Sequence, residues 1–158
     1  MKKKIQTNFF CKSNHWSKRM SKIKNIVRKV ILVDELGFKQ KYVYFINMIF
    51  VNDKVIKKIN AKYRKKNKVT DVLTFVNHIN KNKVQDQAYC DIFFSAETIK
   101  RDATKNLIDF YDHVTHLIIH CFLHVNGYDH KKNSDFEKMK KLEEKILFKF
   151  DIKNPYIR

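Results

Sequence analysis

The chain has 158 residues, of which 44% are hydrophobic, enough to bury a sizeable core in one compact domain. Its 34 Lys and Arg against 16 Asp and Glu give a formal net charge of +18, which indicates either a phosphate-rich partner or a surface solvated by lysine. The two Gly and one Pro exclude a long flexible linker, and no apolar run approaches the roughly 20 residues of a membrane span. We therefore expect residues 1–158 to form a single domain with no membrane partner.

The cysteines and the start of the chain favour a cytoplasmic location. The chain has an odd number of cysteines, Cys11, Cys90 and Cys121, and no C-x-x-C pair. This is typical of reduced thiols rather than of a disulfide framework. The lysines at residues 2–4 resemble the start of a signal peptide. Polar residues soon after them interrupt the apolar stretch that such a peptide needs.

The first elements of the chain are expected to be a strand and a helix. Residues 5–10 are a candidate short strand. Residues 17–36 carry apolar side chains mostly at helical spacing, which predicts a helix. Ser17 is placed to cap this helix, and Gly37 stands where it should end.

The middle of the chain is expected to hold a second strand and a short helix. Residues 42–51 are β-branched and aromatic, as in a buried strand. Asn52 or Asp53 then caps a short helix with an apolar stripe. Residues 62–68, which follow, are polar and basic.

The second half is expected to begin with two strands, 72–76 and 89–94, joined by the polar stretch 77–87. Ser95 should start a helix, with Glu97 near its positive end. Two longer helices are expected over about 109–125 and 134–150. The residues thus predict four strands and about five helices in an α+β fold, with helices packed on a sheet.

A run of histidines predicts a zinc site at the end of the helix expected over 109–125. His120 and His124 are four residues apart, so their imidazoles share a helix face. Gly127 tolerates the positive φ of a reversal that would bring His130 back as a third ligand. Three nitrogen ligands leave one tetrahedral position open for water, as in catalytic zinc sites, and zinc would lower the pKa of that water to roughly 7.

His116 is also four residues from His120, which leaves two helical pairs to choose between. A helix rises about 1.5 Å per residue, so His116 and His124 would lie roughly 12 Å apart along the axis and cannot both bind one ion. Gly127 and His130 favour the pair His120 and His124. The alternative, that these histidines are surface or hydrogen-bonded core residues, is weaker for three histidines at this spacing.

Two neighbours of the histidines have simpler interpretations. Cys121 points about 100° away from His120 around the helix, and we interpret it as a packed small hydrophobe. Asp129 would be either a fourth ligand, a residue that orients a histidine, or a turn-stabilising residue, of which the last is favoured. The spacing also matches metzincin proteases, but those carry a Glu general base where Cys121 stands, which disfavours a peptidase.

Several separated motifs of the chain match the signature of one known protein family, in the same order. Residues 120–130 read H-C-F-L-H-V-N-G-Y-D-H against the family's H-G-x-L-H-L-x-G-Y-D-H. Residues 60–64 and 70–75 read N-A-K-Y-R and T-D-V-L-T-F against N-x-x-Y-R and T-D-V-L-S-F. Residues 90–92 read C-D-I against G-D-I, so that Cys90 and Cys121 both stand at family glycine positions. Met139, with Glu143 or Glu144, is similar to the Met and Glu of the family's last helix.

These motifs resemble those of the YbeY endoribonucleases, a family of bacterial rRNA maturation factors. The resemblance, which spans roughly residues 45–155, implies a zinc-dependent, single-strand-specific endoribonuclease with one Zn²⁺ ion. It implies action in rRNA maturation, including the 3′ end of the small-subunit rRNA, and in ribosome quality control. Expected partners are single-stranded rRNA and the ribosomal small subunit or its proteins, while the oligomeric state stays open. The implied fold is α+β, with a mixed sheet and a cleft at the zinc, in one metal-dependent hydrolase domain.

The family's functional arginine falls on Arg64, which is expected to be both catalytic and substrate-binding. A guanidinium suits this role because its planar fork can hold a phosphate with two hydrogen bonds. Asp71 would either pair with Arg64 or cap the turn before the next strand, and the structural role is favoured. The lysines of residues 62–68 would steer RNA electrostatically.

Two other functions remain open at this point. A ribosome-assembly RNA-binding protein would use zinc structurally, but a structural site normally fills the fourth position with protein, and only Asp129 is placed to do so. Another zinc hydrolase, such as a peptidase or deaminase, is expected to carry H-E-x-x-H or C-x-x-C, and both motifs are missing. Whether water or the RNA 2′-hydroxyl is the nucleophile also stays open.

Overall fold

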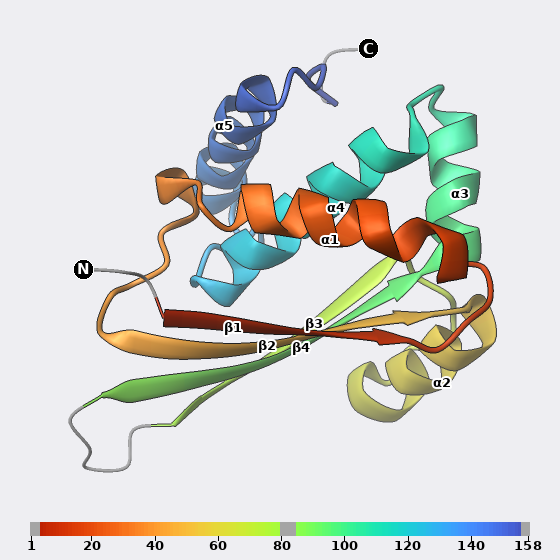
Figure 1. The fold of residues 1–158 in the computed structure, drawn as a ribbon, viewed down its shortest axis with the longest axis horizontal. Helices are drawn as coiled ribbons and strands as arrows, with labels where there is room; N and C mark the ends of the chain where they lie inside the picture. Colours follow the sequence, from red (N-terminus) through yellow and green to blue (C-terminus); the bar gives the residue numbers. More distant parts are fainter. Residues whose placement is uncertain (1–3, 80–84, 156–158) are drawn as a thin grey trace.

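The computed structural model describes residues 4–79 and 85–155, and its centre is a four-stranded sheet in the order β1-β2-β4-β3. The strands are β1 (Lys4–Cys11), β2 (Tyr42–Val51), β3 (Val72–Ile79) and β4 (Asp86–Ser95). β1, β2 and β4 run parallel, while the edge strand β3 is antiparallel to β4 (Figure 1). The four strands and the mixed sheet agree with the expectations from the sequence.

Five α-helices surround this sheet in the described part of the chain. They are α1 (Met20–Val30), α2 (Asp53–Arg64), α3 (Ala96–Lys105), α4 (Phe110–Val125) and α5 (Asn133–Lys149). Figure 1 shows α1, α4 and α5 on one side of the sheet and α2 on the other. The α+β fold with five helices is therefore confirmed. No helix in residues 4–79 or 85–155 is both long and apolar enough to cross a membrane.

The main core lies between the sheet and the layer of α1, α4 and α5. Alternate residues of β2 point into it, because successive strand side chains face opposite ways, and these residues are Tyr44, Ile46, Met48 and Phe50. α4 is the central helix of this layer and buries nine of its sixteen residues. Because α4 is buried on most sides, its polar side chains, including His120 and His124, are held in fixed directions.

A smaller apolar cluster lies on the opposite face, under α2. It contains Val51, Ile56 and Leu73 at its centre. Asn52 caps α2, because its side-chain oxygen accepts a hydrogen bond from the Val55 backbone N–H at 2.9 Å. The structure therefore selects Asn52 rather than Asp53 as the cap.

The helix expected over residues 17–36 is shorter than predicted. Ser17–Arg19 is a 3₁₀ turn, α1 ends at Val30, and a second 3₁₀ turn covers Asp34–Leu36. A continuous helix over 17–36 would be about 30 Å long, more than the roughly 26 Å of the eight-residue β1 that this crossover has to retrace. Ser17 makes no capping hydrogen bond, whereas Gly37 ends the second turn with φ +80° as expected.

The last two strands are longer than the predicted 72–76 and 89–94. β3 continues to Ile79 and β4 begins at Asp86, because residues 77–79 of β3 pair with residues 87–89 of β4 across the antiparallel ladder. Such pairing is a tertiary effect that local composition does not show. The expected helices over 109–125 and 134–150 agree with α4 and α5 to within one residue at each end.

Candidate metal centre

The carboxyl end of α4 and the turn after it position three histidines. His120 and His124 lie on α4, and the helix ends at Asn126, followed by Gly127 with φ +91°. The Asn126 side chain donates to the Leu36 carbonyl at 2.8 Å, which fixes this end of the helix against the turn before β2. The reversal at Gly127 returns the chain so that His130 faces the helix, as the sequence predicted.

The three imidazoles converge on one point. Each offers a ring nitrogen, and these nitrogens all lie within 4.8 Å of one another. The Nε2 atoms of His120 and His124 are 3.0 Å apart. Two nitrogens bound to a tetrahedral zinc ion at 2.0–2.1 Å would be separated by about 3.3–3.4 Å. The residues therefore fit one small divalent cation with little rearrangement.

The tautomer of His124 is fixed by the backbone. Its Nδ1–H donates to the Tyr128 carbonyl at 2.9 Å, which leaves the Nε2 lone pair turned toward the other two rings. Burial, together with the neighbouring His120 and His130, lowers the pKa of His124 to about 4. The ring is therefore neutral at neutral pH, which is the form that binds a metal.

His120 is held by a buried carboxylate from α5. Its Nδ1 donates to Glu143 Oε1 at 2.5 Å, while the other carboxylate oxygen accepts from His116 Nε2 at 2.8 Å. Burial raises the pKa of Glu143, but the hydrogen bonds from His116 and His120 outweigh it and hold that pKa at about 2. A carboxylate behind a ligating histidine fixes its orientation and raises its basicity.

The geometry favours the pair His120 and His124 over the pair His116 and His120. The ring centroids of this pair are 4.5 Å apart, against 6.4 Å for His116 and His120. His116 instead hydrogen-bonds the Glu143 carboxylate from the preceding turn of α4. It is not among the three converging histidines.

The role of Glu143 was not predicted from the residues, although the resemblance named Glu143 or Glu144. The structure selects Glu143, which is fully buried. The signal in the sequence was a charged residue inside an apolar helical stripe that includes Met139, Ile146 and Leu147. A carboxylate at such a position needs buried partners, and the histidines of α4 are those partners.

Asp129 and Cys121 have the structural roles expected of them. Asp129 Oδ1 accepts from the His130 backbone N–H at 2.7 Å, and its other oxygen lies 3.9 Å from the Lys131 ammonium. Asp129 thus stabilises the turn and is not among the converging ligand atoms. Cys121 is fully buried, and burial raises the pKa of its thiol to about 12.

Arg64 lies in the last turn of α2, on a different element from the three histidines. Its guanidinium donates to the Thr74 carbonyl on β3 at 2.7 Å and lies 5.0 Å from the Phe75 ring centroid. The Thr74 side chain reaches Cys121 of α4, so β3 connects the two regions. Asp71 does not hold Arg64; its carboxylate instead accepts from the Val72 backbone N–H at 2.7 Å, which is the turn role favoured above.

Comparison with known proteins shows which family the chain resembles. Residues 9–151 match the Endoribonuclease YbeY family. Endoribonuclease YbeY of Bartonella henselae is 41% identical over 114 residues, which cover 70% of this chain and 71% of that protein. The Ehrlichia chaffeensis protein of the same name is 32% identical over 97% of both chains. For the Rhizobium etli protein the values are 39% identity over 70% of this chain and 66% of that protein.

A solved structure supports the fold independently. The solution structure of a Thermotoga maritima protein matches 97% of this chain and all of its own, with a TM-score of 0.55 and 21% sequence identity. At that identity the likeness concerns the fold alone. The match over residues 9–151 and the relatives that cover most of the chain show that it belongs to the Endoribonuclease YbeY family.

Proposed function

We propose that this chain is a zinc-dependent endoribonuclease that cuts single-stranded RNA during rRNA maturation, with one zinc ion bound by His120, His124 and His130. The observation that supports this most is the convergence of three imidazole nitrogens within 4.8 Å of one another. No fourth His, Cys, Asp or Glu joins this cluster in the part of the chain that the structure describes. An open fourth position is the arrangement of a catalytic rather than a structural zinc site.

The chain's own residues would prepare the site before the substrate arrives. Glu143 and the Tyr128 carbonyl each accept an Nδ1–H, from His120 and His124, so that both Nε2 lone pairs face inward. Zinc, when bound, would act as a Lewis acid toward the phosphodiester and would lower the pKa of a coordinated water to roughly 7. His130 is exposed, so the cluster is open to solvent on that side.

Arg64 is the residue we propose to hold a phosphate of the substrate. Its guanidinium is exposed, and only one of its N–H groups is used by the Thr74 carbonyl. The contact with Phe75 orients the planar group and leaves donors free for two hydrogen bonds to a phosphate. The basic segment 62–68 beside it would attract the RNA backbone.

The setting we propose is the cytoplasm, with rRNA and the ribosomal small subunit or its proteins as partners, in rRNA maturation and ribosome quality control. The three cysteines are free thiols, as is usual in a reducing compartment. The net charge of +18 suits a chain that works on rRNA. The relatives named above are endoribonucleases by name, which supports RNA rather than a peptide as substrate.

The test is cleavage by the purified protein and by His124→Ala, with a panel of single-stranded RNA, a peptide and a nucleoside. We expect the wild type to cut only the RNA and His124→Ala to fall to background at unchanged thermal stability. His78→Ala is the matched control, because His78 is an exposed histidine outside the cluster, and it should keep full activity. Equal RNA cleavage by wild type and His124→Ala would remove the proposal.

The same assay separates the other functions. RNA binding without cleavage by the zinc-loaded wild type would favour a ribosome-assembly protein with a structural zinc. Cleavage of the peptide or deamination of the nucleoside would favour another zinc hydrolase. The ends of the RNA products identify the nucleophile, since a 2′,3′-cyclic phosphate forms only when the 2′-hydroxyl attacks.

A further inference from the structure

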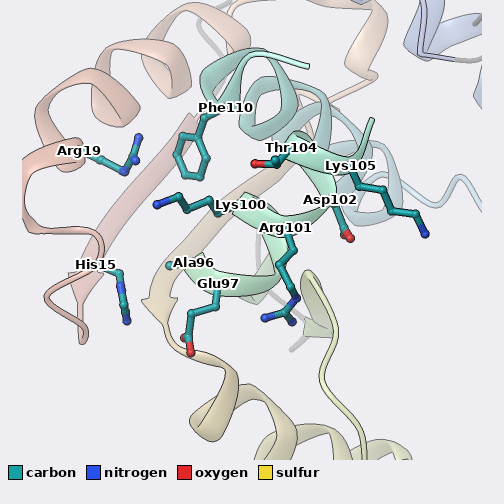
Figure 2. A pocket seen from close by; sticks show the side chains of 10 residues that line it. All are labelled: His15, Arg19, Ala96, Glu97, Lys100, Arg101, Asp102, Thr104, Lys105 and Phe110. Carbon is teal, nitrogen blue, oxygen red and sulfur yellow. The ribbon is translucent and has the colours of Figure 1, made fainter. Parts of the chain in front are cut away.

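A cavity of about 880 Å³ lies at the opposite end of α4 from the histidine cluster (Figure 2). Phe110, the first residue of α4, lines this cavity, whereas His124 stands fourteen residues further on, about 21 Å along the helix axis. The other lining residues come from the turn after β1 and from α3. They are His15, Arg19, Ala96, Glu97, Lys100, Arg101, Asp102, Thr104 and Lys105.

The cavity lies at the edge of the sheet where the parallel strands end. The parallel strands β1, β2 and β4 all end at this edge, at Cys11, Val51 and Ser95. The chain leaves β1 toward α1 on one face and leaves β2 toward α2 on the other (Figure 1). Open sheets commonly bind ligands at this edge, outside the carboxyl ends of their parallel strands. The cavity residues follow directly after β1 and β4.

The lining cations differ in whether a carboxylate already holds them. The Arg101 guanidinium is held by Asp53 at 2.9 Å, and Glu97 accepts from the Asp53 backbone N–H at 2.8 Å. The ion pairs among residues 4–79 and 85–155 include neither Arg19 nor Lys100. Figure 2 shows the Arg19 guanidinium and the Lys100 ammonium on the same side of the cavity, beside the Phe110 ring.

The guanidinium of Arg19 is oriented by aromatic contact rather than by a carboxylate. It lies 3.9 Å from the Phe110 ring centroid, and this stacking leaves its N–H fork unused. The Lys22 ammonium lies 4.0 Å from the ring of the next residue, Tyr111. Two adjoining hollows share His15 with the cavity and add Lys12 and Lys18 to its basic border. Basic side chains interleaved with aromatic rings are typical of surfaces that bind single-stranded nucleic acid.

We propose that this cavity binds a phosphate of the RNA backbone away from the cleaved bond, through Arg19 and Lys100 with His15 at its border. The proposal rests on RNA being the substrate, as proposed above, but not on cleavage itself. An RNA segment that reaches from the histidine cluster to the cavity must span about 21 Å along α4. The cavity would then favour RNA of several nucleotides over very short fragments.

The test is equilibrium binding of a fluorescent 12-nucleotide RNA over a range of salt concentrations. Every protein carries His124→Ala so that no RNA is cut. The cavity variant adds Arg19→Gln with Lys100→Gln. The control adds Lys29→Gln with Lys141→Gln, which removes the same charge from exposed positions on α1 and α5. Thermal unfolding of both variants should match that of the parent protein, because none of the four residues is buried.

We expect the cavity variant to bind the 12-nucleotide RNA about tenfold more weakly than the control at 0.15 M salt. The slope of log affinity against log salt should fall by about 0.7 for each RNA phosphate that the variant no longer neutralises. A dinucleotide should bind equally weakly to both proteins. Equal RNA affinity and slope in the two variants would overturn the proposal. Inorganic phosphate that binds the cavity as tightly as the RNA would also overturn it, in favour of a small-anion site.

Discussion

At the scale of single residues, Glu143 connects the metal centre to the core. Its carboxylate accepts hydrogen bonds from both His116 and His120 and is fully buried between α4 and α5. A buried charge is tolerated only when it is paired in this way. The residue therefore contributes both to the orientation of His120 and to the packing of two helices.

Replacing Glu143 by Gln should weaken zinc binding by about 10–100-fold, because the amide holds His120 less firmly and lowers its basicity. Competition with a chromogenic chelator measures this affinity. Glu144→Gln is the control, since Glu144 is the neighbouring, less buried carboxylate, and it should bind zinc like the wild type. Equal affinities for Glu143→Gln and wild type would show that Glu143 does not support the ligand.

Asp53 links α2 to α3 and gives the fold a dependence on pH. Its carboxylate accepts from Ser95 Oγ at 2.7 Å, Thr98 Oγ1 at 2.6 Å and the Arg101 guanidinium at 2.9 Å. Burial raises the pKa of Asp53, but these hydrogen bonds and the charge of Arg101 outweigh it, so that the pKa lies below its ordinary value of 3.8. The folded state therefore prefers the ionised carboxylate.

Asp53→Asn should lower the free energy of unfolding at pH 7 by about 1.5–3 kcal/mol, the usual worth of hydrogen bonds to a charged group. Because the folded pKa is depressed, the wild type keeps this stability above pH 3.8 and loses it as the pH falls through the lower, folded-state pKa. The difference in the free energy of unfolding between wild type and variant should therefore shrink as the pH falls below 3.8.

Urea unfolding at a series of pH values measures both effects. Glu137→Gln, at an exposed position of α5, is the control and should change stability by no more than about 0.5 kcal/mol. If the free energies of unfolding of wild type and Asp53→Asn differ by the same amount at every pH down to the most acidic one, the proposed role of Asp53 is contradicted.

At the scale of elements, the reversal after α4 decides whether the third histidine reaches the other two. Gly127 has φ +91°, and a Cβ added there would meet no atom within 4 Å. The cost of a side chain at this position is therefore backbone strain alone. Gly37 offers a matched case, with φ +80° and only ordinary contacts to the Tyr128 ring.

Gly127→Ala and Gly37→Ala should each lower the free energy of unfolding by about 1–2 kcal/mol, the cost of the left-handed conformation for an L-residue. Only Gly127→Ala should also weaken zinc binding, because the strain falls on the turn that carries His130. Thermal unfolding and zinc titration of both variants check this. Gly127→Asn should recover part of the loss, since Asn adopts positive φ more readily. Unchanged zinc affinity in Gly127→Ala would show that the conformation of this turn does not affect zinc binding.

The sequence predicted those elements whose signals are local. The His120 and His124 pair, the stop at Gly127 and the bounds of the helix expected over about 109–125 all depend on one helix and its ends, where periodicity and capping chemistry act. The extension of β3 and β4 could not be predicted, because its polar residues form strands only by pairing across the sheet. The same holds for Glu143, whose histidine partners are 23 and 27 residues away.

The split of the helix expected over 17–36 has a different cause. Residues between Val30 and Leu36 carry apolar side chains at most positions, so the pattern gave no sign of where the helix ends. The length of the sheet sets that end, and it is a property of the whole fold. The contact between Arg64 and Thr74 likewise depends on how α2 returns to the edge of β3.

At the scale of the whole molecule, the net charge of +18 should guide the approach of RNA. Replacing Lys62, Lys66 and Lys68 by Gln should reduce the association rate with a single-stranded RNA severalfold at low salt and hardly at all at high salt. Stopped-flow fluorescence measures this rate. The control replaces Lys29, Lys138 and Lys141, which are exposed on α1 and α5. The same reduction in both triple variants would mean that total charge matters and its location does not.

The two binding regions proposed here lie at opposite ends of α4. The helix carries His120 and His124 near its carboxyl end and Phe110 at its start, so one rigid element sets the distance between metal centre and cavity. A packed helix keeps such a distance fixed. The fold would thus set the shortest RNA that can occupy both proposed regions.

The most direct test of the account is a zinc titration of the metal-depleted protein, followed by its rate of single-turnover RNA cleavage. We predict no cleavage without metal and a rate that rises to its maximum at one zinc ion per chain, because only one group of three converging histidines is found in the described residues. His124→Ala should stay inactive across the same titration, while His78→Ala should follow the wild type. Cleavage that persists in the metal-depleted wild-type protein would contradict the account.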